Sequence, residues 1–394
     1  MKRQVKKSLV LAFSMVVAGV LVTNCTKKST LAEEPGSSGQ WAEKSGKAVV
    51  AADVFKHPGV LNTKESLDII GNEVDASPTG ARGIAYNQVK SYVDNVQPSN
   101  AYVAVVTVAG GSSPQSETNF KKDAILSYAL ALRWAKTGDA QYATKAKNIL
   151  NGWAYAFQSF AVTGGESRQA ALEASWAAPN FTAAAEILRR YTCRNGATSG
   201  WSSTDINKFT SFLNNLNQNY IDKVVNTYHM TNNWAVSAGY AKMAIGVFEE
   251  SLNLYNTGLG IIKERLPNLI QADGSMPGET CSHDDFVHFQ YSLTGFSYAA
   301  NIAAIQNDAS VYSDGSSRLR TGYIYLDKII RHAVTDPCGV TWDNSQIQPG
   351  IDIANRRYNT VETNRIQAMG DPHGPTGDNC FLGFTTYTHH QVFP

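Results

Sequence analysis

The stretch DAILSYALALRWAKTGDAQYATKAKNILNGWA, residues 123–154, sets the architecture of this chain. Apolar residues recur at helical spacing over Asp123–Lys136, and the run stops at the turn Thr137–Asp139. A second helical run follows at once, and we predict it over 141–160. Two helices joined by so short a turn run antiparallel and pack together, so the stretch predicts a helical hairpin.

The same alternation of helices and short turns continues along the chain. Further helical runs are predicted over 170–191, from Thr204 onward, and over 232–252, 256–270, 285–306 and 318–334. Successive antiparallel pairs predict an all-α dominated domain, built as a bundle, a solenoid or an α/α toroid. After Asp336 the chain becomes rich in Gly, Asp, Asn and Pro, and we predict a short strand or an ordered loop for its tail, 381–393. No linker divides 48–394, which we therefore predict to be one domain with a loop-rich C-terminal segment.

Composition and charge narrow the classes of function. Hydrophobic residues make up 43% of the chain and charged residues 17%, and the net charge is +1. Because nucleic-acid-binding proteins usually carry a strongly basic surface, we expect no nucleic-acid partner. An anionic ligand would have to be attracted by a local cluster of cations.

The N-terminus predicts export. A basic start, 1–7, precedes an apolar run over 9–22 that is too short for an ordinary membrane-spanning helix. The run ends in Leu-Val-Thr-Asn-Cys25, which resembles the lipobox of bacterial lipoproteins; Asn24 departs from the usual small residue and leaves plain secretory cleavage as the alternative. We predict a signal over 1–25, a flexible tether over 26–47, and a periplasmic or outer-membrane lipoprotein of a Gram-negative bacterium that meets the membrane only through its lipid anchor.

Export permits disulfide bonds. Besides Cys25, the chain has Cys193, Cys281, Cys338 and Cys380, and four cysteines allow three pairings among which the sequence does not choose. None has the spacing of a structural zinc site, so we predict no metal, and we expect no cofactor. For Cys281, which adjoins the candidate site, we expect a structural role.

The residues best suited to chemistry begin at the turn-rich segment DGSMPGE, 273–279. His288 and Tyr291 follow on the next predicted helix, and residues at i and i+3 share one helix face. An imidazole and a phenol placed together suit removal of a proton next to a carboxylate, while the second group protonates a leaving oxygen. The pair therefore predicts an enzyme.

Asn232, Asn233 and Trp234 form a second candidate group. An Asn at the start of a helix is a natural N-cap, and Trp234 would then fill the core. Two adjacent amides before an indole also suit a sugar site, because amides donate to carboxylates and aromatic rings stack on pyranose faces. We favour the second interpretation and predict that Asn232 and Trp234 bind substrate.

Taken in order, several motifs resemble the alginate lyase domain superfamily of polysaccharide lyases. They are KHPGVLNT (56–63), the helix pair 123–154, Asn232–Trp234, DGSMPGE (273–279), the helix that holds Tyr291, and LGFTT (382–386). The resemblance spans nearly all of 50–390. It implies an incomplete α/α toroid and β-elimination at a uronic acid, in which a base removes the C5 proton and an acid protonates O4.

The resemblance also implies roles for single residues. Asn233 matches the Asn that neutralises the substrate carboxylate, and Tyr291 matches the Tyr that serves as acid and is a candidate for the base. Many relatives have His after the paired Asn, whereas this chain has Trp234 there, so the usual imidazole is missing.

We predict that His288 replaces that imidazole. Asp284 and Asp285 precede it on the same run, within reach of its ring. His283 is the second candidate and otherwise a substrate-binding residue, and His229 is the third.

Three more residues are predicted to bind substrate. Glu279 is placed to hold sugar hydroxyls or the Asn pair, with a solvent-facing turn carboxylate as the alternative. Arg357 and Tyr358 are predicted to bind uronate carboxylates, since a guanidinium is shaped for bidentate contact; a solvated helix end is the alternative.

The sequence thus predicts a polysaccharide lyase whose substrate is an acidic polysaccharide, alginate first and glucuronan next. One alternative is an α/α-barrel glycoside hydrolase, which needs two carboxylates across a cleft; Glu166, Glu173, Glu279, Asp284 and Asp285 are available. The other is a glycan-binding surface lipoprotein without catalysis, which the Trp at position 234 favours.

Overall fold

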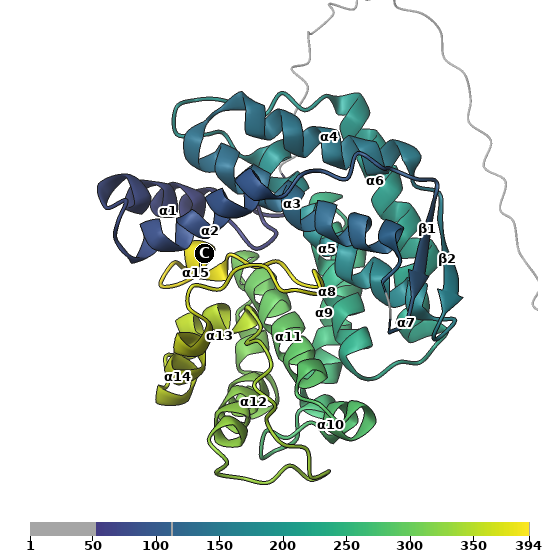
Figure 1. Cartoon of the computed structure of the whole chain (residues 1–394), viewed down its shortest axis with the longest axis vertical. Coiled ribbons are helices and arrows are strands. Elements are labelled where there is room, and N and C mark those ends of the chain that lie inside the picture. Colours follow the sequence, from purple (N-terminus) through teal and green to yellow (C-terminus); the bar gives the residue numbers. More distant parts are fainter. Residues whose placement is uncertain (1–52, 112, 394) are drawn as a thin grey trace, which may run out of the picture. The chain divides into compact units, whose positions relative to one another are not determined.

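The computed structural model describes residues 53–111 and 113–393, which belong to one compact unit. This part of the chain is an incomplete α/α toroid, in which antiparallel helices dominate and the strands form one small sheet (Figure 1). The predicted signal, Cys25 and the tether 26–47 lie outside the described residues. Within the described ranges, no helix is long and apolar enough to cross a lipid bilayer.

The helices and strands follow one another along the chain in a fixed order. They are α1 (Lys64–Ala76), α2 (Ala81–Asn95), β1 (Val105–Ala109), α3 (Gln115–Thr137), α4 (Ala140–Ala156), β2 (Ser159–Gly164), α5 (Gln169–Arg190), α6 (Ser203–Leu216), η1 (Asn217–Ile221), α7 (Asp222–Asn226), α8 (Asn233–Phe248), α9 (Leu252–Leu269), α10 (Pro277–His283), α11 (Val287–Ile305), η2 (Ser310–Tyr312), α12 (Asp314–Ile330), α13 (Gly350–Tyr358), α14 (Val361–Gly370) and α15 (Thr385–Thr388).

The predicted helical hairpin is confirmed by α3 and α4. Gly138 ends α3 in the left-handed conformation, with φ of 68°, and its N–H donates to the carbonyl of Trp134 at 2.7 Å. A side chain at this position would also strike Asn195, so the turn requires glycine. Asp139 then caps α4 by accepting from the N–H of Gln141.

The helix predicted over 141–160 is wrong at its end, because α4 stops at Ala156. The chain then turns into β2, which pairs in parallel with β1. Phe157 and Phe160 pack against each other, with ring centroids 4.9 Å apart, and both pack against Phe120 of α3. Burial of these rings favours the extended chain over another helical turn.

Helices α5, α8 and α11 are largely buried and form the inner part of the toroid. Helix α8 packs against α5, α9 and α11, and every one of its residues is buried. Gly239 of α8 and Gly258 of α9 allow their backbones to approach closely, since a side chain on Gly258 would collide with the carbonyl of Gly239. Helix α11, which holds His288 and Tyr291, packs directly on α8.

The C-terminal tail runs into the interior of the toroid, crossing from α15 towards α5 (yellow in Figure 1). Asp352 of α13 anchors it, because its carboxylate accepts from the hydroxyls of Thr385 and Thr386 at 2.7 and 3.1 Å. The carbonyl of Cys380 accepts from Asn180 of α5 at 3.1 Å. The tail is an ordered loop followed by the short helix α15, so the alternative prediction of a strand is wrong. Side-chain hydrogen bonds hold this segment in place of strand pairing.

His57 ties the segment before α1 to the body of the domain. Its Nδ1 lies 2.8 Å from the carboxylate of Glu186 on α5, and its Nε2 contacts Glu250 beyond α8. Its side chain is only 5% exposed. Desolvation alone would lower the pKa of His57, but the hydrogen bond and charge of Glu186 raise it above the ordinary value of 6.5. At pH values below this raised pKa, an imidazolium bridges two carboxylates.

We expect His57→Gln to lower the free energy of unfolding by about 1–3 kcal/mol in mildly acidic buffer, because it takes the imidazolium away from the buried carboxylate of Glu186. A group with a raised pKa contributes fully below its unfolded pKa, 6.5 for His57, and the contribution is lost as the pH rises through the folded value. Denaturant unfolding at a series of pH values should show the difference between wild type and variant shrinking as pH rises. The exposed His332, replaced by Asn, is the control, and a difference independent of pH would contradict the account.

Candidate active site

A pocket of about 480 Å³ is lined by carboxylates, an ammonium, two imidazoles and aromatic rings. Its lining comes from the loop after β1, from α3, α5, α8, α10 and α11, and from the C-terminal loop. The lining residues are Ala109, Gly110, Gly111, Ser113, Glu117, Lys121, Gln169, Leu172, Glu173, Trp176, Trp234, His283, His288, Tyr291, Asp378 and Cys380. A hollow of similar size beside α2 is lined by apolar, amide and hydroxyl side chains without Asp, Glu, Lys, Arg or His. Two other hollows of similar size have charged linings, but the first pocket is the one that combines two imidazoles with a phenol and an ammonium.

His288 lies on the first turn of α11 and is fixed by a carboxylate. Its Nδ1 is 2.8 and 2.9 Å from the two oxygens of Asp285, and Asp285 also accepts from the backbone N–H of His288. Because Nδ1 donates to Asp285, Nε2 is left with its lone pair. Burial lowers the pKa of His288, and Asp285 offsets only part of that effect. The side chain is 29% exposed, so a neutral imidazole faces the pocket.

His283 lies parallel to His288. The two ring centroids are 3.7 Å apart and the planes differ by 8°. His283 is the last residue of α10, and its Nδ1 lies 3.0 Å from the carbonyl of Glu279. The preferred and the second candidate for the base therefore stand side by side at one wall of the pocket.

Tyr291 stands one helical turn after His288, with ring centroids 5.5 Å apart. Its hydroxyl donates to Asp378 at 2.5 Å, and Trp176 packs edge-on to its ring at 5.7 Å. Burial, followed by the neighbouring Cys380 and Asp378, raises the pKa of Tyr291 well above the ordinary value of 10. The phenol therefore keeps its proton at neutral pH.

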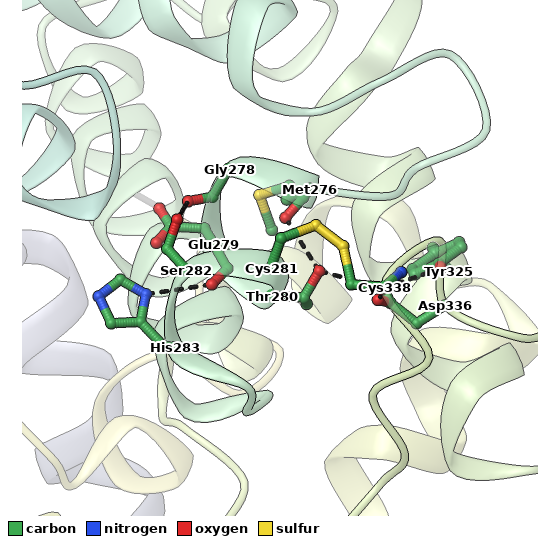
Figure 2. Close-up of a disulfide and its surroundings, with 10 residues drawn as sticks. All are labelled: Met276, Gly278, Glu279, Thr280, Cys281, Ser282, His283, Tyr325, Asp336 and Cys338. Atoms are coloured by element: carbon green, nitrogen blue, oxygen red, sulfur yellow. Dashed lines mark hydrogen bonds between the residues drawn. A yellow bond between two sulfur atoms is a disulfide. The ribbon is translucent and has the colours of Figure 1, made fainter. Parts of the chain in front are cut away.

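A disulfide between Cys281 and Cys338 attaches α10 to the loop after α12 (Figure 2). Beside it, the hydroxyls of Thr280 and Tyr325 both contact the carboxylate of Asp336, at 3.2 and 3.3 Å. The expected structural role of Cys281 is confirmed, and the buried thiols of Cys193 and Cys380 form no disulfide within the described part of the chain. The bridge holds the short helix that carries His283.

The Asn pair does not meet the pocket as predicted. Asn232 is the N-cap of α8 and accepts from the N–H of Trp234 at 3.3 Å. Asn233 is 0% exposed and does not line the pocket, and its Nδ2 donates to Glu279 at 2.8 Å. Glu279, also 0% exposed, accepts from Ser292 as well. Glu279 thus joins α8, α10 and α11 in the layer behind the pocket.

Trp234 does line the pocket, and the guanidinium of Arg168 lies 6.0 Å from its ring centroid. Arg357 and Tyr358 lie elsewhere: the Arg357 guanidinium is 5.2 Å from the ring of Tyr312, and the Tyr358 hydroxyl donates to the Tyr312 carbonyl at 2.8 Å. Neither lines the pocket, and His229 does not line it either. The structure therefore brings together Trp234, His283, His288 and Tyr291 from the sequence candidates.

Comparison with known proteins identifies the family. The family model described as alginate lyase matches residues 70–328, more than half of the chain. The chain belongs to the alginate lyase family. No curated protein sequence matches it significantly.

Solved alginate lyases share the fold of this family member. A Tyr-to-Phe variant of alginate lyase A1-III complexed with a tetrasaccharide superposes with a TM-score of 0.63 at 15% identity, covering 84% of this chain and 96% of that one. Alginate lyase A1-III from Sphingomonas species A1 gives 0.58 at 16% identity, with 84% and 97% covered. An alginate lyase from Bacteroides ovatus gives 0.59 at 13% identity, with 82% and 97% covered.

Among the described residues, one group of side chains has the spacing to hold a metal ion, and it lies outside the pocket. Asp53, His57 and Glu250 bring their donor atoms within 4.8 Å of one another. Cationic side chains already contact these carboxylates, because His57 lies between Glu186 and Glu250 and Arg190 lies 3.0 Å from Glu250. We therefore describe it as an ion-pair network.

Several pocket residues of this alginate lyase family member were not predicted from the sequence. Lys121 lies between Glu117 and Glu173, and Asp378 and Cys380 arrive on the C-terminal loop. The available signal for Lys121 was a charged residue on an apolar helix face, whereas its partner Glu173 was named from the sequence as a candidate carboxylate of the hydrolase alternative. Asp378 gave no such signal, since it sits in a loop whose path depends on tertiary contacts.

Proposed function

We propose that the protein cleaves a uronate-containing polysaccharide, alginate first, by β-elimination in this pocket. The observation that carries the proposal is the pair His288 and Tyr291, which project from one face of α11 with ring centroids 5.5 Å apart. Each is held by its own carboxylate, Asp285 or Asp378. Membership of the alginate lyase family supports the same reaction class.

His288 is the proposed base. Its Nε2 takes the proton from C5 of the uronate as the double bond forms between C4 and C5. The lowered pKa of His288 keeps the imidazole neutral and able to accept that proton at neutral pH. Once protonated, the ring is stabilised by Asp285, which accepts from Nδ1.

Tyr291 is the proposed acid. As the bond between C4 and O4 breaks, the phenol gives its proton to the departing oxygen. The raised pKa of Tyr291 ensures that the proton is present when the substrate arrives. The carboxylate of Asp378 keeps the hydroxyl at the pocket wall until then.

The arrangement also favours one stereochemistry. Because both groups stand on one helix face, we propose that they reach the C5 proton and O4 from the same side of the sugar ring. In mannuronate and glucuronate these two groups lie on the same side, whereas in guluronate they lie on opposite sides. We therefore expect poly-mannuronate and glucuronan to be cleaved faster than poly-guluronate.

Ultraviolet absorbance of the new conjugated double bond, followed with purified protein on the three polymers, tests the proposal. Absorbance should rise on poly-mannuronate or glucuronan and rise more slowly on poly-guluronate. A flat trace on all three, from folded protein, would overturn the proposed reaction. A faster rise on poly-guluronate would overturn the same-side geometry alone.

A glycoside hydrolase is less well supported by the pocket. Such an enzyme needs two carboxylates on either side of the scissile bond. Glu117 and Glu173 both contact the ammonium of Lys121, at 3.0 and 3.1 Å, and so share one wall. Asp285 and Asp378 hold His288 and Tyr291.

We further propose that the protein acts outside the cytoplasm, as the N-terminal sequence predicts. The disulfide between Cys281 and Cys338 supports this, because such bonds persist in oxidising compartments. Fractionation of the producing cells, with detection of lipid on Cys25, would test the location and the anchor.

A further inference from the structure

The proposed reaction needs a group that stabilises the substrate carboxylate, and Asn233, predicted for this role, does not line the pocket. Removal of the C5 proton places negative charge on the substrate carboxylate, and that charge must be stabilised by fixed donors. Asn233 is 0% exposed and its amide is turned to Glu279. Among the described residues that line the pocket, Lys121 is the only Lys or Arg.

We propose that Lys121 binds the carboxylate of the uronate being cleaved, an inference that rests on the proposed function. Its ammonium lies 3.0 Å from Glu117 and 3.1 Å from Glu173. An ammonium has three N–H donors, so two carboxylate contacts leave at least one donor for a ligand in the pocket.

The two carboxylates fix the ammonium in place. Glu117 accepts from the N–H of Ala109 and from the hydroxyl of Ser113, both at 3.1 Å, and so is tied to β1 and the loop after it. Glu173 accepts from Gln169 at 2.8 Å on α5. Lys121 is therefore positioned before any substrate arrives, as electrostatic stabilisation of a transition state requires.

Lys121 also faces the same wall as the proposed acid. Its ammonium lies 5.6 Å from the ring centroid of Trp176, and Trp176 packs against Tyr291. The uronate carboxylate is attached to C5, next to C4 and O4. Lys121, which shares the pocket and the neighbour Trp176 with Tyr291, is thus placed to meet the carboxylate while Tyr291 meets O4.

The energetic cost of the cluster points to function. Lys121 is 7% exposed and its two partners 2% and 1%, so three ionisable groups have left water. Such buried ion pairs are often replaceable by apolar residues without loss of stability. Burial raises the pKa of Glu173 despite the nearby Lys121, so holding this carboxylate charged beside the ammonium costs free energy. A uronate carboxylate bound at the remaining N–H of Lys121 would be a further anion for the ammonium to stabilise.

The test compares Lys121→Met and Lys121→Arg with Lys122→Met, a matched loss of charge at the next residue of α3, which does not line the pocket. On the best polyuronate we expect Lys121→Met to lower kcat by about 10²–10³-fold, the loss typical of one fixed charge-stabilising donor. Lys121→Arg should recover part of that loss, and Lys122→Met should behave as wild type. Near-wild-type kcat in Lys121→Met would overturn the proposal.

A double variant shows whether Lys121 binds the substrate or only neutralises Glu117 and Glu173. Lys121→Met leaves Glu117 and Glu173 unpaired and could unfold the domain, whereas Lys121→Met with Glu173→Gln removes one of these charges. If Lys121 only neutralises the glutamates, the double variant will regain activity, which would overturn the proposal. If Lys121 binds the substrate, the double variant will fold, as thermal unfolding reports, and stay inactive.

The affinity for an oligouronate, measured by calorimetry, tests the role of Lys121 independently of the lyase reaction. An oligouronate should bind the wild type at least about 10-fold more tightly than Lys121→Met, while its carboxyl-reduced counterpart should bind both equally. Binding that depends on Lys121 without cleavage by the wild type would sink the lyase reaction and support Lys121. Equal oligouronate binding by both proteins, or none by either, would overturn the role of Lys121.

Discussion

Replacing Tyr291 by Phe should lower kcat on the best polyuronate by about 10²–10⁴-fold, the range expected when a general acid is removed. The substitution deletes the hydroxyl that donates to Asp378 and that we assign to protonation of O4. It keeps the ring, which packs against Trp176 and Phe381, so the fold should survive. Initial rates from ultraviolet absorbance, together with KM, measure the effect, and KM should change little.

The control for Tyr291→Phe is Tyr255→Phe on α9. The buried hydroxyl of Tyr255 has no hydrogen-bond partner among the residues that the structure describes, and its ring packs against Phe55, outside the pocket. This variant loses the same atom and should keep the wild-type rate. A Tyr291→Phe protein that retained more than about a tenth of wild-type kcat would remove Tyr291 from the role of acid.

Replacing His288 by Gln should lower kcat by a similar factor of about 10²–10⁴ and also change the pH profile. Wild-type activity should rise with pH as His288 loses its proton. Because the pKa of His288 lies below the ordinary 6.5, that rise should be complete at a lower pH than for an exposed histidine. In His288→Gln the acidic limb of the profile should disappear.

Asp285→Asn supplies the second half of this test. Asp285 raises the pKa of His288 against the larger lowering effect of burial, so its removal should move the acidic limb to still lower pH. His283→Gln is the competing variant, because its ring lies 3.7 Å from that of His288. If His283→Gln abolished the acidic limb while His288→Gln kept it, the base would be His283.

Much of the fold could be predicted because local signals agreed with the final structure. Gly138 ended α3 where the sequence placed the turn, and the Ala-rich run predicted over 170–191 is α5, Gln169–Arg190. The end of α4 could not be predicted in this way. Phe157 and Phe160 suit a helix or a strand, and contact with the distant Phe120 decides between them.

In the candidate site, too, residues placed by local geometry could be predicted and residues placed by tertiary contacts could not. His288 and Tyr291 lie three residues apart on one helix, so local geometry alone brings them together. Lys121 and Asp378 reach the pocket from α3 and the C-terminal loop, and only tertiary packing brings them into the same pocket as Tyr291. Asn233 matched a family motif, yet its amide is turned to the buried Glu279, a contact that sequence spacing does not reveal.

The most direct test of the central claim, β-elimination by this pocket, is the mass of the products formed by the wild type from a defined oligouronate. Elimination divides the chain without adding water, so the masses of the two fragments should sum to the mass of the substrate, and one fragment should carry the new double bond. Fragments whose masses sum to the substrate plus one water would show hydrolysis and contradict the account.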